Sequence, residues 1–139
     1  MQTVTFKANF SILDSVRDLV GEAAERAGMN SKEVYAVQLA ADEACSNVIE
    51  HAYEGVTDAD FEMIVDTQPG QVTIVVHDHG KLFDITKVRK PNLSKNLDER
   101  EVGGLGVYLI HKLMDEVRFE STKDNGNFLT MTKRSSGGT

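Results

Sequence analysis

Hydrophobic and polar positions follow two different periods along the chain, and the changes of period predict the order of strands and helices. Residues 3–9 alternate apolar and polar side chains, which is typical of a strand with one buried face. From residue 12 to residue 27 the apolar positions recur at helical spacing, and Gly28 stands where a helix commonly ends. Ser11 is placed to cap the start of this helix.

A second helix is predicted to begin after Asn30, because Glu33 completes a capping-box pattern with it. The opposite side of this helix from its apolar face carries Glu43, Asn47 and Glu50, with Glu43 and Asn47 one turn apart. The apolar face should pack against a sheet and consists of Val34, Val37, Ala41, Ala44, Cys45, Val48 and Ala52.

The rest of the chain predicts two hairpins separated by a third helix. Residues 61–66 and 71–77 are rich in β-formers and flank a Pro-Gly turn, and residues 117–122 and 127–133 flank Asn125-Gly126. Residues 83–102 show no sustained period, and an apolar helical face follows them from residue 107. This order predicts an α/β two-layer sandwich, with the helices on one face of a mixed, mainly antiparallel sheet.

Length and composition are those of one globular domain. The chain has 139 residues, of which 40% are hydrophobic and 27% charged, and we expect one domain over residues 1–134 and a flexible tail over residues 135–139. No run is long enough to cross a bilayer and no signal-peptide core begins the chain, which favours a cytoplasmic protein without membrane contact. The net charge of −7 argues against direct nucleic-acid binding. Cys45, on the apolar helix face, is expected to be a buried structural thiol.

Two short sequences carry candidate chemistry. A carboxylate beside a carboxamide, as in Glu43 and Asn47, can accept a proton and hold a hydrated magnesium ion, although a solvated polar face has the same pattern. Asp78 follows a predicted strand and could accept a hydrogen bond from an exocyclic amine, while Gly80 would let a flat ring approach the backbone. Asp-x-Gly is also a common turn sequence.

A third candidate is the glycine-rich run 103–106 that precedes the third predicted helix. Glycines at a helix start let backbone N–H groups approach an anion such as phosphate, although simple loop chemistry gives the same composition. The run matches neither the Walker pattern nor the Rossmann fingerprint. A metal site at His77 and His79 is disfavoured because no cysteine lies nearby.

These sequences occur together in the order and spacing of the GHKL ATPase superfamily, as residues 43–47, 78–80, 103–106 and 126–132. Over nearly all of residues 3–133, the chain most closely resembles the bacterial anti-sigma factor serine kinases of the partner-switching type. The resemblance implies the Bergerat-type ATP-binding fold, with ATP between the helices and a lid over about residues 84–104. A basic residue often precedes the Leu-Gly of the glycine run, and Gly104 stands there in this chain. A phosphate-binding cation would then come from the lid, where the candidates are Lys87, Arg89, Lys90, Lys95 and Arg100.

The resemblance also implies a role for individual residues. Glu43 would be the general base toward a serine hydroxyl, Asn47 would hold the magnesium ion that bridges the ATP phosphates, and Asp78 would bind the adenine amino group. Gly80 would give clearance for the base, and Thr130 would support Asp78 or a water at the adenine. Gly104 and Gly106, with the neighbouring backbone amides of Gly103 and Leu105, would cradle the phosphates. Residues 102–105 would form the hinge of the lid.

The implied function is an ATP-dependent serine/threonine kinase that phosphorylates an anti-anti-sigma protein of the STAS type and sequesters a sigma factor. Members of this family commonly form homodimers. Three alternatives stay open. The first is a nucleotide-binding anti-sigma module with weak or no kinase activity, and the second is the kinase domain of a histidine-kinase-like protein or a related kinase with another target. The third is a structural domain without nucleotide. The presence of both Glu43 and Asn47 favours the kinase over the binding module.

Overall fold

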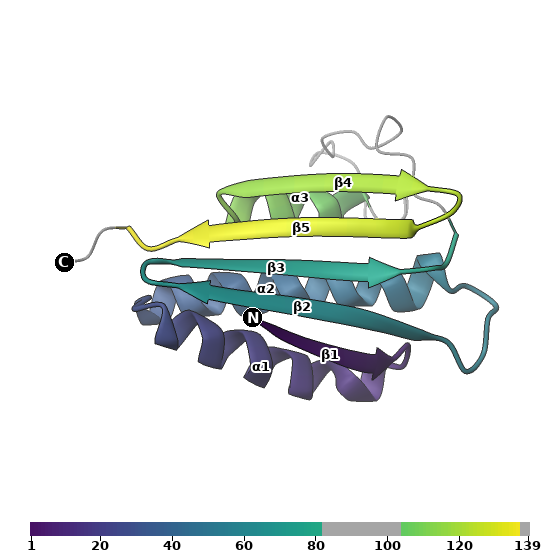
Figure 1. Cartoon of the computed structure of the whole chain (residues 1–139), viewed down its shortest axis with the longest axis horizontal. Coiled ribbons are helices and arrows are strands. Elements are labelled where there is room, and N and C mark those ends of the chain that lie inside the picture. The colour runs from purple at the N-terminus through teal and green to yellow at the C-terminus, as the bar shows by residue number, and fades with distance from the viewer. Residues whose placement is uncertain (82–103, 137–139) are drawn as a thin grey trace.

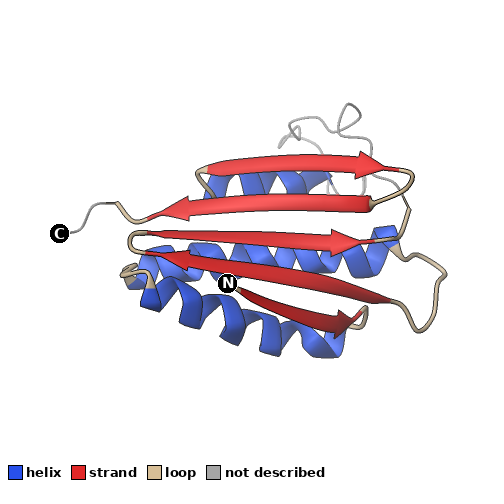
Figure 2. Ribbon diagram, viewed as in Figure 1, coloured by secondary structure: helices blue, strands red, loops and turns tan. Residues whose placement is uncertain are grey.

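The structure is a computed structural model and describes residues 1–81 and 104–136. The described residues form a five-stranded sheet. Figures 1 and 2 show the helices on one face of this sheet, which confirms the predicted two-layer α/β sandwich. The strands are β1 (Gln2–Lys7), β2 (Asp60–Gln68), β3 (Gln71–Asp78), β4 (Glu116–Thr122) and β5 (Gly126–Arg134). The helices are α1 (Leu13–Arg26), α2 (Ser31–Asn47) and α3 (Gly104–Leu113), with a 3₁₀ turn η1 (Phe10–Ile12) and a π-helical turn η2 (Val48–Ala52).

The sheet has the order β1-β2-β3-β5-β4, and every neighbouring pair of these strands is antiparallel. The mixed sheet expected from the sequence is therefore corrected for the described strands. The physical reason is the position of β5, which lies between β3 and β4 (Figure 1). Since β3 and β4 run in the same direction, they would form a parallel pair if they were neighbours. Both expected hairpins are confirmed, and the second one turns through residues 123–125.

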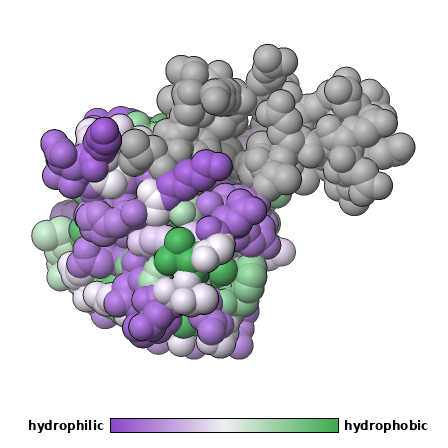
Figure 3. Space-filling model, turned by 90° about the vertical axis from the view of Figure 1, so that its right-hand side faces the viewer, coloured by the Kyte–Doolittle hydropathy of each residue, from purple (hydrophilic) through white to green (hydrophobic). Residues whose placement is uncertain are grey.

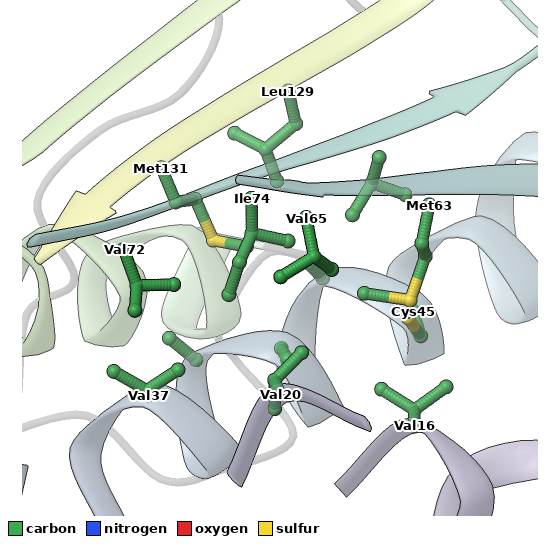
Figure 4. Close-up of a cluster of buried hydrophobic side chains, with 14 of the residues drawn as sticks. Val16, Val20, Val37, Cys45, Met63, Val65, Val72, Ile74, Leu129 and Met131 are labelled. Atoms are coloured by element: carbon green, nitrogen blue, oxygen red, sulfur yellow. Dashed lines mark hydrogen bonds between the residues drawn. The ribbon is translucent and has the colours of Figure 1, made fainter. Parts of the chain in front are cut away.

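The core lies between the sheet and the helices. Strand alternation directs every second side chain of β2, β3 and β5 toward α1 and α2, and Figure 4 shows these side chains meeting the buried helix residues. Cys45 is part of this layer, with its Sγ 3.7 Å from the Sδ of Met63. Burial raises the pKa of the Cys45 thiol well above its ordinary value, which agrees with a structural role. The largest fully buried side chains include Phe61, Met63, Ile74, Ile110 and Met131.

The starts of the first two helices differ in how they are capped. Asn9, and not Ser11, supplies the first cap: its side chain accepts the Ser11 N–H at 2.8 Å and opens η1, from which α1 continues without a side-chain cap of its own. The 3₁₀ turn therefore replaces the expected Ser11 cap. The capping box at the start of α2 is confirmed, because Asn30 and Glu33 each accept the other's backbone N–H.

The first two residues of the expected tail, Ser135 and Ser136, are hydrogen-bonded to the domain. The Ser135 N–H donates to the Gly70 carbonyl at 2.8 Å, and the Ser136 N–H donates to Glu33 Oε2 at 2.6 Å. Residues 137–139 lie outside the described residues, as do residues 82–103, which hold the expected lid apart from Gly104. In the two described ranges, no helix is long and apolar enough to cross a membrane.

Candidate functional site

Helix α2 presents two of the predicted site residues side by side. Glu43 and Asn47 are one turn apart and half-buried, next to the fully buried Ala44 and Cys45 of the core face. Burial, followed by the negative charges of Asp42 and Glu50, raises the pKa of Glu43 above its ordinary value. Glu43 is therefore a stronger base than a solvated glutamate, as proton abstraction requires.

Asp78 ends β3 on the side of the sheet that faces the helices, and it is only 5% exposed. Its Oδ1 accepts the backbone N–H of Gly80 at 2.9 Å and the side-chain Nδ2 of Asn127 at 2.8 Å. Its Oδ2 has no hydrogen bond to any residue of the described ranges. Because buried polar atoms are almost always paired, this oxygen fits a donor supplied by a ligand, such as an exocyclic amine.

The loop after Asp78 is fastened to the end of the α2–η2 helix by two hydrogen bonds. The carbonyl of Ala52 accepts the Lys81 N–H at 2.6 Å, and the hydroxyl of Tyr53 accepts the His79 N–H at 2.9 Å. The same hydroxyl donates to the carbonyl of Asp60 at 2.7 Å. The α2–η2 helix, which carries Glu43 and Asn47, is thus joined directly to the loop that follows Asp78.

Gly80 lies within this joint. A Cβ at residue 80 would stand 2.3 Å from the Ala52 carbonyl oxygen, so the close approach of the loop to η2 requires a glycine. The π-helical turn η2 places that carbonyl there, and π-helical turns are frequent at functional sites. The expected role of Gly80 beside a nucleobase stays a prediction, and the contact with Ala52 is a second, structural reason for the glycine.

The structure does not bring Thr130 to Asp78. Thr130 pairs with Val75, whereas Asp78 pairs with Asn127. Since Asp78 faces the helices and lies an odd number of residues from Val75, the side chain of Thr130 points to the opposite face of the sheet. Asn127 therefore takes the supporting position that the sequence analysis assigned to Thr130.

Two residues of this site, Asn127 and Tyr53, are not among the site residues predicted from the sequence. Strand alternation could have identified the first, because Leu129 and Met131 mark the buried face of the last strand and Asn127 shares their parity. For Tyr53 no such signal exists, since its partners His79 and Asp60 belong to segments that only the fold brings together.

The glycine-rich run opens a helix, as expected, because α3 begins at Gly104, and α3 packs against α2. The phosphate roles of Gly104, Leu105 and Gly106 stay predictions. The remaining phosphate and lid assignments lie outside the described residues, namely Gly103, Lys87, Arg89, Lys90, Lys95 and Arg100.

The predicted protein ligand of a magnesium ion is Asn47. Across residues 1–81 and 104–136, no three His, Cys, Asp or Glu side chains come together as a metal-binding group. Magnesium commonly keeps several waters and takes one or two protein oxygens together with substrate phosphates, so the amide oxygen of Asn47 fits this mode.

His77 is engaged with protein groups instead. Its Nε2 lies 2.7 Å from the Asn125 carbonyl, its Nδ1 lies 3.5 Å from Glu62, and its ring stacks on Phe128 at 3.9 Å.

Figure 3 shows the end of the molecule at which β3 finishes, and the described surface there is mainly hydrophilic around a small hydrophobic area.

Comparison with known proteins gives a consistent result. A family model described as a histidine kinase-like ATPase domain matches residues 6–133. The chain is 34% identical over 136 residues to a serine-protein kinase RsbW of Halalkalibacterium halodurans, an alignment that covers 94% of this chain and 80% of the relative. It is 29% identical to the serine-protein kinase RsbW of Bacillus subtilis, over 88% of this chain and 78% of the relative.

Two solved structures share the fold. A crystal structure of the RsbU and RsbW domains of a Mycobacterium tuberculosis protein superposes with a TM-score of 0.62 at 18% identity, over 96% of this chain and 31% of the other. The histidine kinase domain of a blue-light activated histidine kinase from Erythrobacter litoralis superposes with a TM-score of 0.56 at 15% identity, over 91% of this chain and 61% of the other.

Proposed function

The chain belongs to the histidine kinase-like ATPase domain family, and on this basis we propose that it is an ATP-dependent protein serine/threonine kinase of the RsbW type. The observation that carries the proposal is the buried carboxylate of Asp78 at the end of β3, with one oxygen that has no hydrogen bond to any described residue. The loop that follows it is fastened to the end of the helix of Glu43 and Asn47. The relatives named serine-protein kinase RsbW support the choice of serine/threonine as acceptor.

Each residue has a defined task in this proposal. Asp78 accepts the adenine amino group through Oδ2, and Asn47 contributes an oxygen ligand to the magnesium ion. Bound magnesium-ATP supplies the transferable phosphoryl group. Glu43 accepts the proton of the serine hydroxyl as its oxygen attacks, and its raised pKa suits this transfer. Positioning and charge neutralisation contribute most of the catalysis in such reactions.

We further propose the partners of a partner-switching kinase. The protein substrate is an anti-anti-sigma protein of the STAS type, and the sequestered protein is a sigma factor, with the kinase acting as a homodimer. Nucleotide state and phosphorylation then determine which partner is held, because each partner has a different affinity for each state. The family resemblance supports the partners, and the names of the relatives support a serine-protein kinase.

The test measures binding and phosphoryl transfer separately. Calorimetric titration with ATP, with and without magnesium, should show magnesium-dependent binding that Asn47→Ala weakens and Glu43→Gln retains. Transfer of labelled γ-phosphate to a STAS protein whose gene neighbours that of this chain should be abolished by Glu43→Gln. Glu54→Gln is the matched control, because it makes the same chemical change at an exposed position.

Four results would contradict the proposal or a part of it. Absence of ATP binding at millimolar nucleotide would leave the fold without the function. Transfer at the wild-type rate by Glu43→Gln would remove that residue as the base, and unchanged magnesium-dependent affinity in Asn47→Ala would remove the metal assignment. Tight ATP binding without transfer to any STAS partner would instead support a nucleotide-binding anti-sigma module.

A further inference from the structure

Asn127 makes an unusually complete set of hydrogen bonds for a residue that is only 7% exposed. Its Nδ2 donates to Asp78 Oδ1 at 2.8 Å and to the Lys81 carbonyl at 2.9 Å. Its Oδ1 accepts the hydroxyl of Ser121 at 2.6 Å. One amide group therefore connects the carboxylate of Asp78, the loop that follows it and the neighbouring strand β4.

These partners fix the orientation of the amide. If the amide of Asn127 were turned over, its oxygen would face the carboxylate of Asp78 and the carbonyl of Lys81, which are both acceptors. The hydroxyl of Ser121, which donates to the amide oxygen, would at the same time face the amide nitrogen, which is a donor. All three contacts favour the same orientation, so Asn127 presents a donor, and only a donor, to Asp78.

The backbone at Gly126 explains how Asn127 reaches this position. Gly126 has a φ of +84°, and a Cβ there would lie 2.3 Å from the carbonyl oxygen of Asp78. A glycine thus lets the first residue of β5 approach the end of β3 closely, and the register then places Asn127 directly opposite Asp78.

We propose that Asn127, oriented by Ser121, is a positioning residue for base recognition, because it holds the carboxylate of Asp78 in the orientation that directs Oδ2 at the ligand. This inference rests on the proposed function. Two donors, the N–H of Gly80 and the Nδ2 of Asn127, occupy Oδ1, and Oδ2 stays available. The carboxylate then offers the ligand an acceptor only. A 6-amino purine satisfies it, whereas a 6-oxo purine places a second acceptor against it and leaves both unpaired.

The test combines a change in the ligand with a change in the protein. Equilibrium affinities for ATP, for purine riboside triphosphate, which lacks the 6-amino group, and for inosine triphosphate are measured with the full chain. Wild-type protein should prefer ATP to purine riboside triphosphate by roughly 10- to 100-fold, since the amino group donates to a charged, buried acceptor. In Asn127→Ala this preference should fall below about threefold, because the carboxylate is no longer held with an oxygen aligned on the amino group, and a misaligned hydrogen bond is weak.

A purely structural role for Asn127 would give a different pattern, in which the affinities for all three nucleotides fall by the same factor. Asn125→Ala is the matched control, since it removes the same side chain from an exposed position in the same hairpin and should leave the preference unchanged. Ser121→Ala keeps the amide but removes its orienting donor, and it should lower the preference at least twofold. This variant also serves if Asn127→Ala fails to fold.

The outcomes separate this inference from the proposed function. If wild-type protein binds none of the nucleotides, the proposed function fails. If it prefers ATP and the preference persists in Asn127→Ala and Ser121→Ala, the positioning role is overturned while the proposed function stands. If wild-type protein binds ATP without preferring it over the analogue, the acceptor role of Asp78 is wrong, and the role of Asn127 is wrong with it.

Discussion

Replacement of Tyr53 by phenylalanine tests whether the joint between η2 and the Asp78 loop holds the site together. Tyr53 is 8% exposed, and its hydroxyl accepts the His79 N–H at 2.9 Å and donates to the Asp60 carbonyl at 2.7 Å. Tyr53→Phe keeps the packed ring and removes one oxygen atom. The change therefore measures the two hydrogen bonds and little else.

The expected loss follows from those two bonds. Each net hydrogen bond contributes about 1 kcal/mol to stability, so the variant should lose about 2 kcal/mol. The value stays at this level because the residues of both partners, His79 and Asp60, are exposed, and water can reach their backbone groups. For a chain of 139 residues the entropy of unfolding is about 0.3 kcal/mol per kelvin, so the melting temperature should fall by about 7 °C.

Urea unfolding followed by far-ultraviolet circular dichroism measures this loss. Tyr35→Phe is the control, because it makes the same change on helix α2 at a side chain that is 58% exposed, and its midpoint should stay at the wild-type value. ATP affinity of Tyr53→Phe should fall severalfold as well, since His79 lies between Asp78 and Gly80. A Tyr53→Phe midpoint equal to that of Tyr35→Phe would refute the reasoning that the hydroxyl holds the joint.

Three further predictions follow from the same geometry. Gly80→Ala should lose about 1–3 kcal/mol in urea unfolding, because the new Cβ would meet the Ala52 carbonyl at 2.3 Å and neither backbone can yield cheaply; an unchanged midpoint would contradict this contact. The proposed kinase activity should fall with decreasing pH at a pH above the ordinary glutamate pKa, because the proposed base Glu43 must be deprotonated to act and burial raises its pKa. A decline of kcat/KM centred near pH 4.3, the ordinary glutamate value, would contradict this role. Hydrogen bonds from the backbone N–H groups of Asn30 and Ser136 lower the pKa of Glu33, so its stabilising contribution should be complete above the unfolded-state pKa of about 4.3 and be lost as the pH falls through the lowered folded value. Glu33→Gln should therefore flatten the acid side of the stability profile in urea unfolding, and a profile as steep as that of the wild type would argue against it.

Local patterns in the sequence predicted the elements well because local physics determines them. Strand alternation, the Pro69-Gly70 turn and the reciprocal caps of Asn30 and Glu33 act within a few residues, and all three are found as expected. The Asp-x-Gly pattern after a strand made Asp78 a candidate for binding a ligand, and the family resemblance gave it the adenine role. Its burial and its unpaired oxygen are consistent with that prediction.

The contacts that sequence reasoning missed are all made between distant segments. The insertion of β5 between β3 and β4 decides that Asn127, and not Thr130, meets Asp78. The anchoring of Ser136 by Glu33 likewise joins the end of the described chain to the start of α2. Alternation marks Asn127 as a residue of the buried face, but no periodic signal gives its partner or that of Ser136, because each pairing depends on which segments become neighbours after the sheet has formed.

The pairing of β3 with β5 has a consequence for the order in which the molecule assembles. These strands are adjacent in the sheet but are joined through residues 79–125, so their pairing closes a much longer loop than either hairpin does and carries a larger entropic cost. We expect both hairpins to form early and the seam between them to close late. Asp78 and Asn127 face each other across that seam, so a ligand that requires both would recognise only chains in which folding is complete.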